Sequence, residues 1–122
     1  MKWLPVVGYE GLYEVSDTGL VRSVDRVVVD SLGRPRKMKS RNLKLHHHKS
    51  GYLRAHLSKF GICEKRTVHK LVVSAFVGPC PSGLEVRHLD SDSTNNHLPN
   101  LLYGTHAENE ADKRTKQAQV FA

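Results

Sequence analysis

The chain has 122 residues, 39% of them hydrophobic and 25% charged, which suits one compact domain and leaves too little apolar material for two independent cores. It has neither an apolar run of roughly 18 residues nor the charged-then-apolar start of a secretory signal, so we expect a soluble cytosolic protein without a membrane span. The formal net charge is +7, and the excess is uneven: residues 22–70 hold 14 lysines and arginines but only three acidic residues.

A basic region of this density predicts a polyphosphate partner, because each neutralised phosphate releases counterions. A basic face that is merely solvated is the alternative. The two cysteines, Cys63 and Cys80, lack the CxxC spacing of a zinc site, so no structural zinc is expected. We expect both to be buried as small apolar residues.

The first part of the chain predicts short antiparallel strands. Residues 3–28 alternate apolar and polar side chains over short runs, with turn signals at Gly8, Gly11 and residues 17–19. Residues 32–44 contain six basic residues and little periodicity, which indicates a mobile loop or hairpin tip that an anionic partner would order.

The middle of the chain predicts a strand and then a helix. Residues 51–58 alternate with Leu53, Ala55 and Leu57 on one face, which is the pattern of a half-buried strand. Residues 67–78 carry apolar side chains at helical spacing, and the Gly-Pro pair at 78–79 would end that helix.

The last third predicts strand, loop, strand and helix. A short strand over residues 84–89 precedes the turn-rich residues 91–96, and residues 97–104 form a second strand or extended stretch. Thr105 and Glu108 have the spacing of a capping box, which would start a helix that runs to about Lys116.

Three polar residues in this segment suggest chemistry. His88, at the end of the predicted strand, is placed to be a general base, and Asn109, in the first turn of the capped helix, could ligate a hard cation beside a phosphate. Asn100, on the second strand, could hold the imidazole or pin the loop. The alternative is that the asparagines are turn and cap residues and that His88 is a surface histidine.

The sequence resembles a known enzyme family. The segments VHKLVVSAFVG (68–78) and VRHLDSDSTNNHLPNLLYGTHAEN (86–109) are similar to HNH endonucleases of the phage and homing type, built on a ββα-metal finger. The segment WLPVVGYEGLYEVSDTGLVRS (3–23) is similar to the modular DNA-binding motif that commonly precedes such domains. Together these matches cover most of residues 3–113.

The resemblance implies an α+β fold, with a basic antiparallel strand-rich part over residues 1–60 and an HNH nuclease core over residues 61–122, joined as one unit. It implies His88 as the base that activates water, Asn100 as the middle residue that supports the finger, and Asn109 as the ligand of one Mg²⁺ or Mn²⁺ ion. The products would carry 5′-phosphate and 3′-hydroxyl ends.

One residue departs from the family pattern. Many relatives have a metal-ligating aspartate before the base histidine, whereas this chain has Arg87, which cannot ligate a cation. Asp112, at i+3 from Asn109, is the nearest replacement, and Asp90 is a weaker one. Arg87 itself could grip a phosphate. His69 also matches a family histidine, and it could be functional or simply packed against the core.

Double-stranded DNA is the expected partner of a phage- or mobile-element-encoded nuclease of this kind, with a homodimer or phage packaging protein as further possibilities. One rival is a DNA-binding module that has lost catalysis, for which Arg87 is the only sequence support; another is a basic RNA-binding domain, which no RNA-recognition motif supports. The expected DNA contacts come from the basic residues Arg36, Lys37, Lys39, Arg41, Lys44, Arg54 and Arg87.

Overall fold

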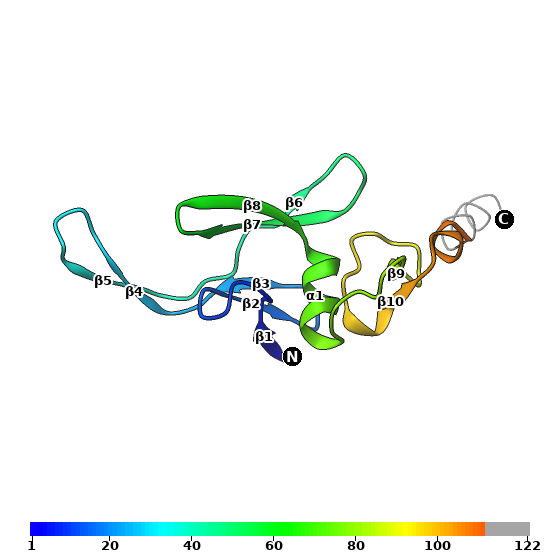
Figure 1. The fold of residues 1–122 in the computed structure, drawn as a ribbon, viewed down its shortest axis with the longest axis horizontal. Helices are drawn as coiled ribbons and strands as arrows, with labels where there is room; N and C mark the ends of the chain where they lie inside the picture. Colours follow the sequence, from blue (N-terminus) through cyan, green and yellow to red (C-terminus); the bar gives the residue numbers. More distant parts are fainter. Residues whose placement is uncertain (112–122) are drawn as a thin grey trace.

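The computed structural model describes residues 1–111 as an elongated set of small antiparallel sheets gathered around one helix, α1 (Val68–Phe76) (Figure 1). The first sheet has the order β1 (Trp3–Pro5), β2 (Tyr13–Ser16) and β3 (Val21–Ser23). A separate hairpin of β4 (Arg26–Val29) and β5 (Pro35–Met38) projects from one end of the molecule. The basic segment 32–44 thus contains the tip of this hairpin and its second strand, β5.

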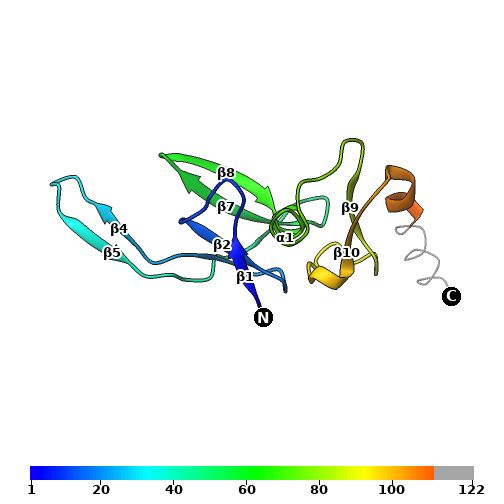
Figure 2. The same ribbon diagram turned by 60° about the horizontal axis from the view of Figure 1, so that its bottom comes forward.

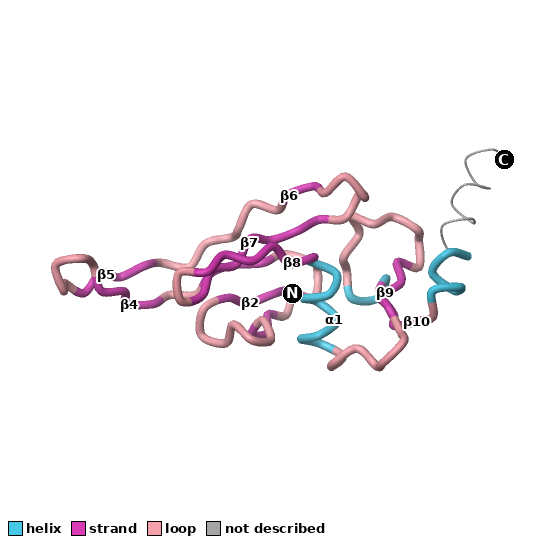
Figure 3. Tube along the Cα trace, turned by 45° about the horizontal axis from the view of Figure 1, so that its top comes forward, coloured by secondary structure: helices cyan, strands magenta, loops and turns pink. Residues whose placement is uncertain are grey.

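A second three-stranded sheet leads into α1. It comprises β6 (His46–His47), β7 (Leu53–Lys59) and β8 (Ile62–Thr67), and α1 begins directly after β8. At the far end from the hairpin, β9 (Glu85–His88) pairs with β10 (Leu101–Gly104), which follows the 3₁₀ turn η1 (Leu98–Asn100) (Figure 3). Residues 106–111 are helical.

One hydrophobic core joins these elements. Val15 and Val21 of the first sheet, Leu57 of β7 and Val72 of α1 are fully or almost fully buried, and all belong to one cluster that also includes Leu101 of β10. Burying one such side chain stabilises the fold by about 1.5–3 kcal/mol. The core therefore fixes the β9–β10 hairpin against the amino-terminal sheet through α1.

The sequence predicted most of this architecture. The α+β class, the early strands, the β7 strand and the α1 helix are confirmed, and the apolar stripe of α1 lies in the core as expected. The expected burial of the cysteines is wrong: Cys63 lies on exposed β8 and Cys80 in an exposed turn, and neither forms a disulfide. Within residues 1–111, no helix is long and apolar enough to cross a membrane.

Candidate active site

His88 is held in place by an asparagine from the following loop. It is the last residue of β9, lies opposite Leu101 and is only 5% exposed. Its Nε2 lies 2.9 Å from Oδ1 of Asn96, which is itself 3% exposed. In this orientation of the amide, whose Nδ2 is buried without a partner, Nε2 is the donor to Oδ1 and Nδ1 is the acceptor nitrogen of the ring.

Two further rings surround this histidine. The His69 ring, from the first turn of α1, lies 5.1 Å from the His88 ring in an edge-on arrangement, and Tyr52 stacks obliquely against His69 at 4.8 Å. Burial, with smaller contributions from His88 and Lys70, lowers the pKa of His69 to about 3. His69 is therefore neutral near pH 7, and its buried Nδ1 has no hydrogen-bond partner. The structure packs this histidine directly against the predicted base.

Asn100 pins the loop and does not touch the imidazole. Its Nδ2 donates to Oδ1 of Asp90 and to the carbonyl of Asn95, both at 2.9 Å, and its Oδ1 accepts from the Asp90 backbone N–H at 3.0 Å. The prediction that it lies on the second strand is wrong, because it ends η1 and β10 begins at Leu101, which pairs with His88. Asn100 was expected either to hold the imidazole or to pin the loop, and these contacts match the second role.

Sequence reasoning missed Asn96. The signal was the paired Asn95-Asn96, but two adjacent polar residues in a turn do not show which one faces inwards. In the structure the two asparagines have different partners. Asn95 Nδ2 donates to Asp90 Oδ2 at 2.6 Å within the loop, and Asn96 Oδ1 contacts His88.

Asn109 lies where the capping box predicted it. Thr105 Oγ1 accepts from the Glu108 backbone N–H at 3.2 Å, and Glu108 Oε1 accepts from the Thr105 backbone N–H at 3.0 Å, which is the reciprocal capping arrangement. One residue further on, Asn109 is buried, and its Nδ2 donates to Oε1 of Glu85 at 2.6 Å. Glu85 was not a predicted site residue, although strand alternation places it on the same face of β9 as Arg87.

Arg87 is docked against the carboxy-terminal helix. Its Nη1 lies 3.2 Å from Oε2 of Glu108, and its side chain is 18% exposed. The aliphatic part crosses Gly104 so closely that a Cβ there would lie 2.1 Å from Arg87 Cδ, and only glycine leaves this room. The Glu108 carboxylate thus pairs with the positive charge of Arg87, which stands where the family pattern has an aspartate.

Glu85 and Asn109 carry the carboxylate and amide oxygens that a small hard cation prefers. Mg²⁺ typically takes one or two carboxylates and keeps its other positions for phosphate and water. Glu85 supplies a carboxylate, whose Oε1 accepts from Asn109 Nδ2 at 2.6 Å and lies 3.3 Å from His106 Nδ1. The Asn109 amide therefore turns its nitrogen, and not its oxygen, toward this carboxylate. Asp90 is used by the loop contacts to Asn95 and Asn100, and Asp112 lies outside the described residues. In residues 1–111 no group of three acidic, histidine or cysteine ligands gathers at one point, so a metal here would depend on substrate oxygens.

The predicted DNA-contacting residues form two basic surfaces. The predicted residues of the β4–β5 hairpin and its continuation are all exposed: Arg36, Lys37, Lys39, Arg41 and Lys44. The second surface is the outer face of β7, where Arg54 and His56 lie in register with Thr67 and Lys65 of β8. His56 stacks on His46 at 4.1 Å, and burial together with the nearby cations lowers its pKa.

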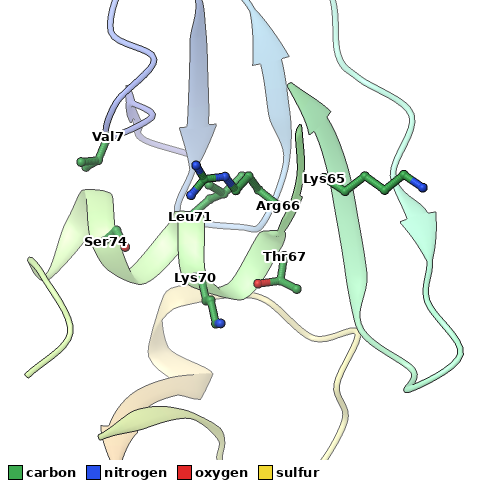
Figure 4. Close-up of a pocket in the computed structure, with 7 residues that line it drawn as sticks. All are labelled: Val7, Lys65, Arg66, Thr67, Lys70, Leu71 and Ser74. Atoms are coloured by element: carbon green, nitrogen blue, oxygen red, sulfur yellow. The ribbon is translucent and has the colours of Figure 1, made fainter. Parts of the chain in front are cut away.

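A shallow pocket of about 380 Å³ lies near the start of α1. Its lining includes Lys70, a basic residue that was not among the predicted DNA contacts. Figure 4 shows Arg66 lying over Leu71, while Lys65 extends in the opposite direction. Arg66 is paired with Glu64, whereas Lys70 is exposed in the first turn of α1 beside His69. The pocket does not include His88, so the side-chain geometry, and not the hollow, marks the candidate site.

Comparison with known proteins gives consistent matches along the chain. Residues 1–58 match the NUMOD4 motif, and residues 66–111 match the family model of HNH endonucleases. The DNA endonuclease I-HmuI of Bacillus phage SP01 is 34% identical over 118 residues, which are 94% of this chain and 60% of that protein. A solved structure describing DNA binding and cleavage by the HNH homing endonuclease I-HmuI has a TM-score of 0.73 at 34% identity, covering 100% of this chain and 66% of that one. The chain thus spans about three fifths of the length of its curated relative.

Proposed function

Because this chain belongs to the HNH endonucleases that carry an amino-terminal NUMOD4 motif, we propose that it is a divalent-metal-dependent endonuclease that hydrolyses phosphodiester bonds in double-stranded DNA. The observation that carries the proposal is the contact of 2.9 Å between His88 Nε2 and Asn96 Oδ1, which orients the ring and favours the tautomer with an unprotonated Nδ1. The phage relative supports a role in phage or mobile-element biology.

In the proposed reaction, His88 is the catalytic residue. Its Nδ1 takes a proton from a water molecule, and the oxygen of that water attacks the phosphorus and displaces the 3′ oxygen. Asn96 is a positioning residue, because it keeps the proton on Nε2 and fixes the plane of the ring. His69 stays neutral beside the base, so it does not place a second positive charge there when His88 becomes protonated.

Asn109 and Glu85 are the residues that would hold the metal ion, Mg²⁺ or Mn²⁺, through an amide oxygen and a carboxylate. When bound, the ion would stabilise negative charge on the phosphate and on the departing oxygen. Glu85 thereby takes over the part that the family often gives to an aspartate at the position of Arg87. Asn100 supports the fold of the loop and does not contact the reacting atoms.

The basic surfaces would carry the DNA. The basic residues on or next to the projecting hairpin would contact phosphates far from His88: Arg36, Lys37, Lys39, Arg41 and Lys44. Arg54 lies on β7, and Lys70 lies within α1. Arg87 is held by Glu108, so we assign it to the support of the helix before any phosphate contact. One base per chain predicts nicking by a monomer, and cutting of both strands would then require a homodimer.

The test is conversion of supercoiled plasmid to nicked or linear form across a panel of Mg²⁺, Mn²⁺, Ca²⁺ and chelator. The proposal expects conversion with Mg²⁺ or Mn²⁺ and none with chelator. Salt-sensitive DNA binding without cleavage in any metal would instead support the inactive DNA-binding module that Arg87 suggests. Calorimetric titration of Mn²⁺ into the protein and into the Glu85→Gln variant tests the metal ligand separately: unchanged affinity would remove Glu85 from the site.

A further inference from the structure

The loop that carries Asn96 rests on a turn from the NUMOD4 part of the chain. The backbone N–H of Leu98 donates to the carbonyl of Asp17 at 2.8 Å. Gly19 packs so tightly on Asn96 that a Cβ at Gly19 would lie 2.8 Å from Asn96 Cβ and 3.2 Å from its carbonyl oxygen. Figures 1 and 2 show this β2–β3 turn ending beside η1, across about 80 residues of sequence.

The β2–β3 turn is itself a rigid support. Ser16 is completely buried, and its Oγ accepts from the Leu20 backbone N–H at 2.9 Å and bonds Thr18 Oγ1 at 2.9 Å. The backbones of Ser16 and Leu20 also pair at 2.8 Å, and the Gly19 N–H donates to the Ser16 carbonyl at 3.1 Å. These hydrogen bonds restrict the movement of the turn, and they therefore also restrict the position of Asn96, which packs on Gly19.

The loop is also attached at a second point. Ser93 Oγ donates to the carbonyl of Gly51 at 2.9 Å, in the turn between β6 and β7. A Cβ on Gly51 would lie 2.9 Å from that same hydroxyl oxygen. The loop between β9 and η1 is thus held from outside at both Ser93 and Asn96, while Asn100 holds it from within.

From these contacts we infer that the β2–β3 turn, residues 17–19, is a positioning element of the nuclease site: Gly19 sets the place of Asn96, and Asn96 sets the ring of His88. The NUMOD4 part then contributes to catalysis itself, in addition to any DNA contact. The inference rests on the proposed role of His88 as the base.

Backbone conformation alone does not explain Gly19. Its φ of +91° favours glycine, but Gly8 and Gly11 in the same part of the chain have φ of +87° and +79° and would meet nothing within 4 Å if they carried a Cβ. Gly11 therefore shares the conformational demand of Gly19 without its contact to the loop. This pair gives a matched control inside one structural unit.

The experiment compares Gly19→Ala with Gly11→Ala in the full chain. Both introduce a Cβ at positive φ, so both should lower the melting temperature, and Gly19→Ala should lower it further because its Cβ also meets Asn96. Gly19→Ala should also displace Asn96, and a misplacement of about 1 Å near a base can slow the chemical step by about 100-fold. We expect kcat for plasmid nicking to fall by that order for Gly19→Ala, with DNA affinity unchanged, and to stay near the wild-type value for Gly11→Ala.

A spectroscopic readout separates positioning from general damage. Nitrogen-15 chemical shifts of the His88 ring, assigned by comparison with His88→Ala, should report the Nε2–H tautomer in the wild type and in Gly11→Ala, and a mixture of tautomers in Gly19→Ala. If Gly19→Ala does not fold, Asn96→Ala removes the same link from the loop side and should show the same loss of kcat and of tautomer preference.

Equal kcat and equal tautomer populations in the two glycine variants would overturn the inference, as would a wild-type tautomer in Asn96→Ala. These results are distinguishable from failure of the proposed function. If His88→Ala retains the wild-type rate, the assignment of the base is wrong; if His88→Ala is inactive and Gly19→Ala matches Gly11→Ala, only the inference about the turn falls.

Discussion

Mild acid should destabilise this protein through His69. Burial, then the nearby His88 and Lys70, lowers the pKa of His69 from 6.5 to about 3, and the residue is only 6% exposed. Below pH 6.5 the unfolded chain therefore binds a proton that the folded chain does not, so stability falls as the pH falls, down to the folded pKa. Integrated from about pH 7 to about pH 5, this one group lowers the free energy of unfolding by about 2 kcal/mol.

The measurement is urea denaturation at both pH values for the wild type and for His69→Phe. Phenylalanine keeps a ring against Tyr52, and the Nδ1 that it removes has no partner to lose. Groups away from this cluster are the same in both proteins, so the difference between the two acid-induced losses reports His69 together with the effect of its removal on the adjacent His88. We expect the variant to lose about 2 kcal/mol less than the wild type. Equal losses would show that His69 is not kept neutral by burial.

Three other experiments test the core, the DNA interface and the metal site separately. Leu57→Ala, at a fully buried site, should lower the free energy of unfolding by about 2–5 kcal/mol, whereas exposed Ile62→Ala should change it by less than about 0.5 kcal/mol; similar urea midpoints would contradict the core assignment. Replacing both Arg36 and Lys37 by alanine should weaken DNA binding and reduce the slope of log affinity against log salt by about 2, and an unchanged slope would remove the hairpin from the interface. Arg87→Asp should tighten Mn²⁺ binding in calorimetry by about tenfold, and no gain would mean that position 87 does not face the metal.

The elements with strong local signals were predictable from sequence. The α1 helix has a clear apolar stripe with Gly78 and Pro79 behind it, and the Thr105–Glu108 capping box forms both of its reciprocal bonds. β8 gave no such signal: its residues are almost all exposed, so no burial period marks it, and it is ordered by pairing with β7.

The loop between β9 and η1 was predictable only in part. The sequence indicated that His88 and its asparagines belong together, but Asn95, Asn96 and Asn100 are chemically identical, and local pattern does not rank them. Tertiary contacts decide their roles. Gly19, far upstream in the sequence, packs against Asn96, whereas Asn100 bonds Asp90 within the same loop. Glu85 was missed for a similar reason, since its contact with Asn109 exists only once the last helix packs on β9.

The central claim is that His88 is the base of a metal-dependent DNA hydrolase. The most direct measurement is single-turnover nicking of supercoiled plasmid by the wild type and by His88→Ala, at saturating Mn²⁺ and with DNA affinity measured for both. We expect equal DNA affinity and a cleavage rate reduced by about 10²–10⁴-fold in the variant. Cleavage by His88→Ala at the wild-type rate would contradict it.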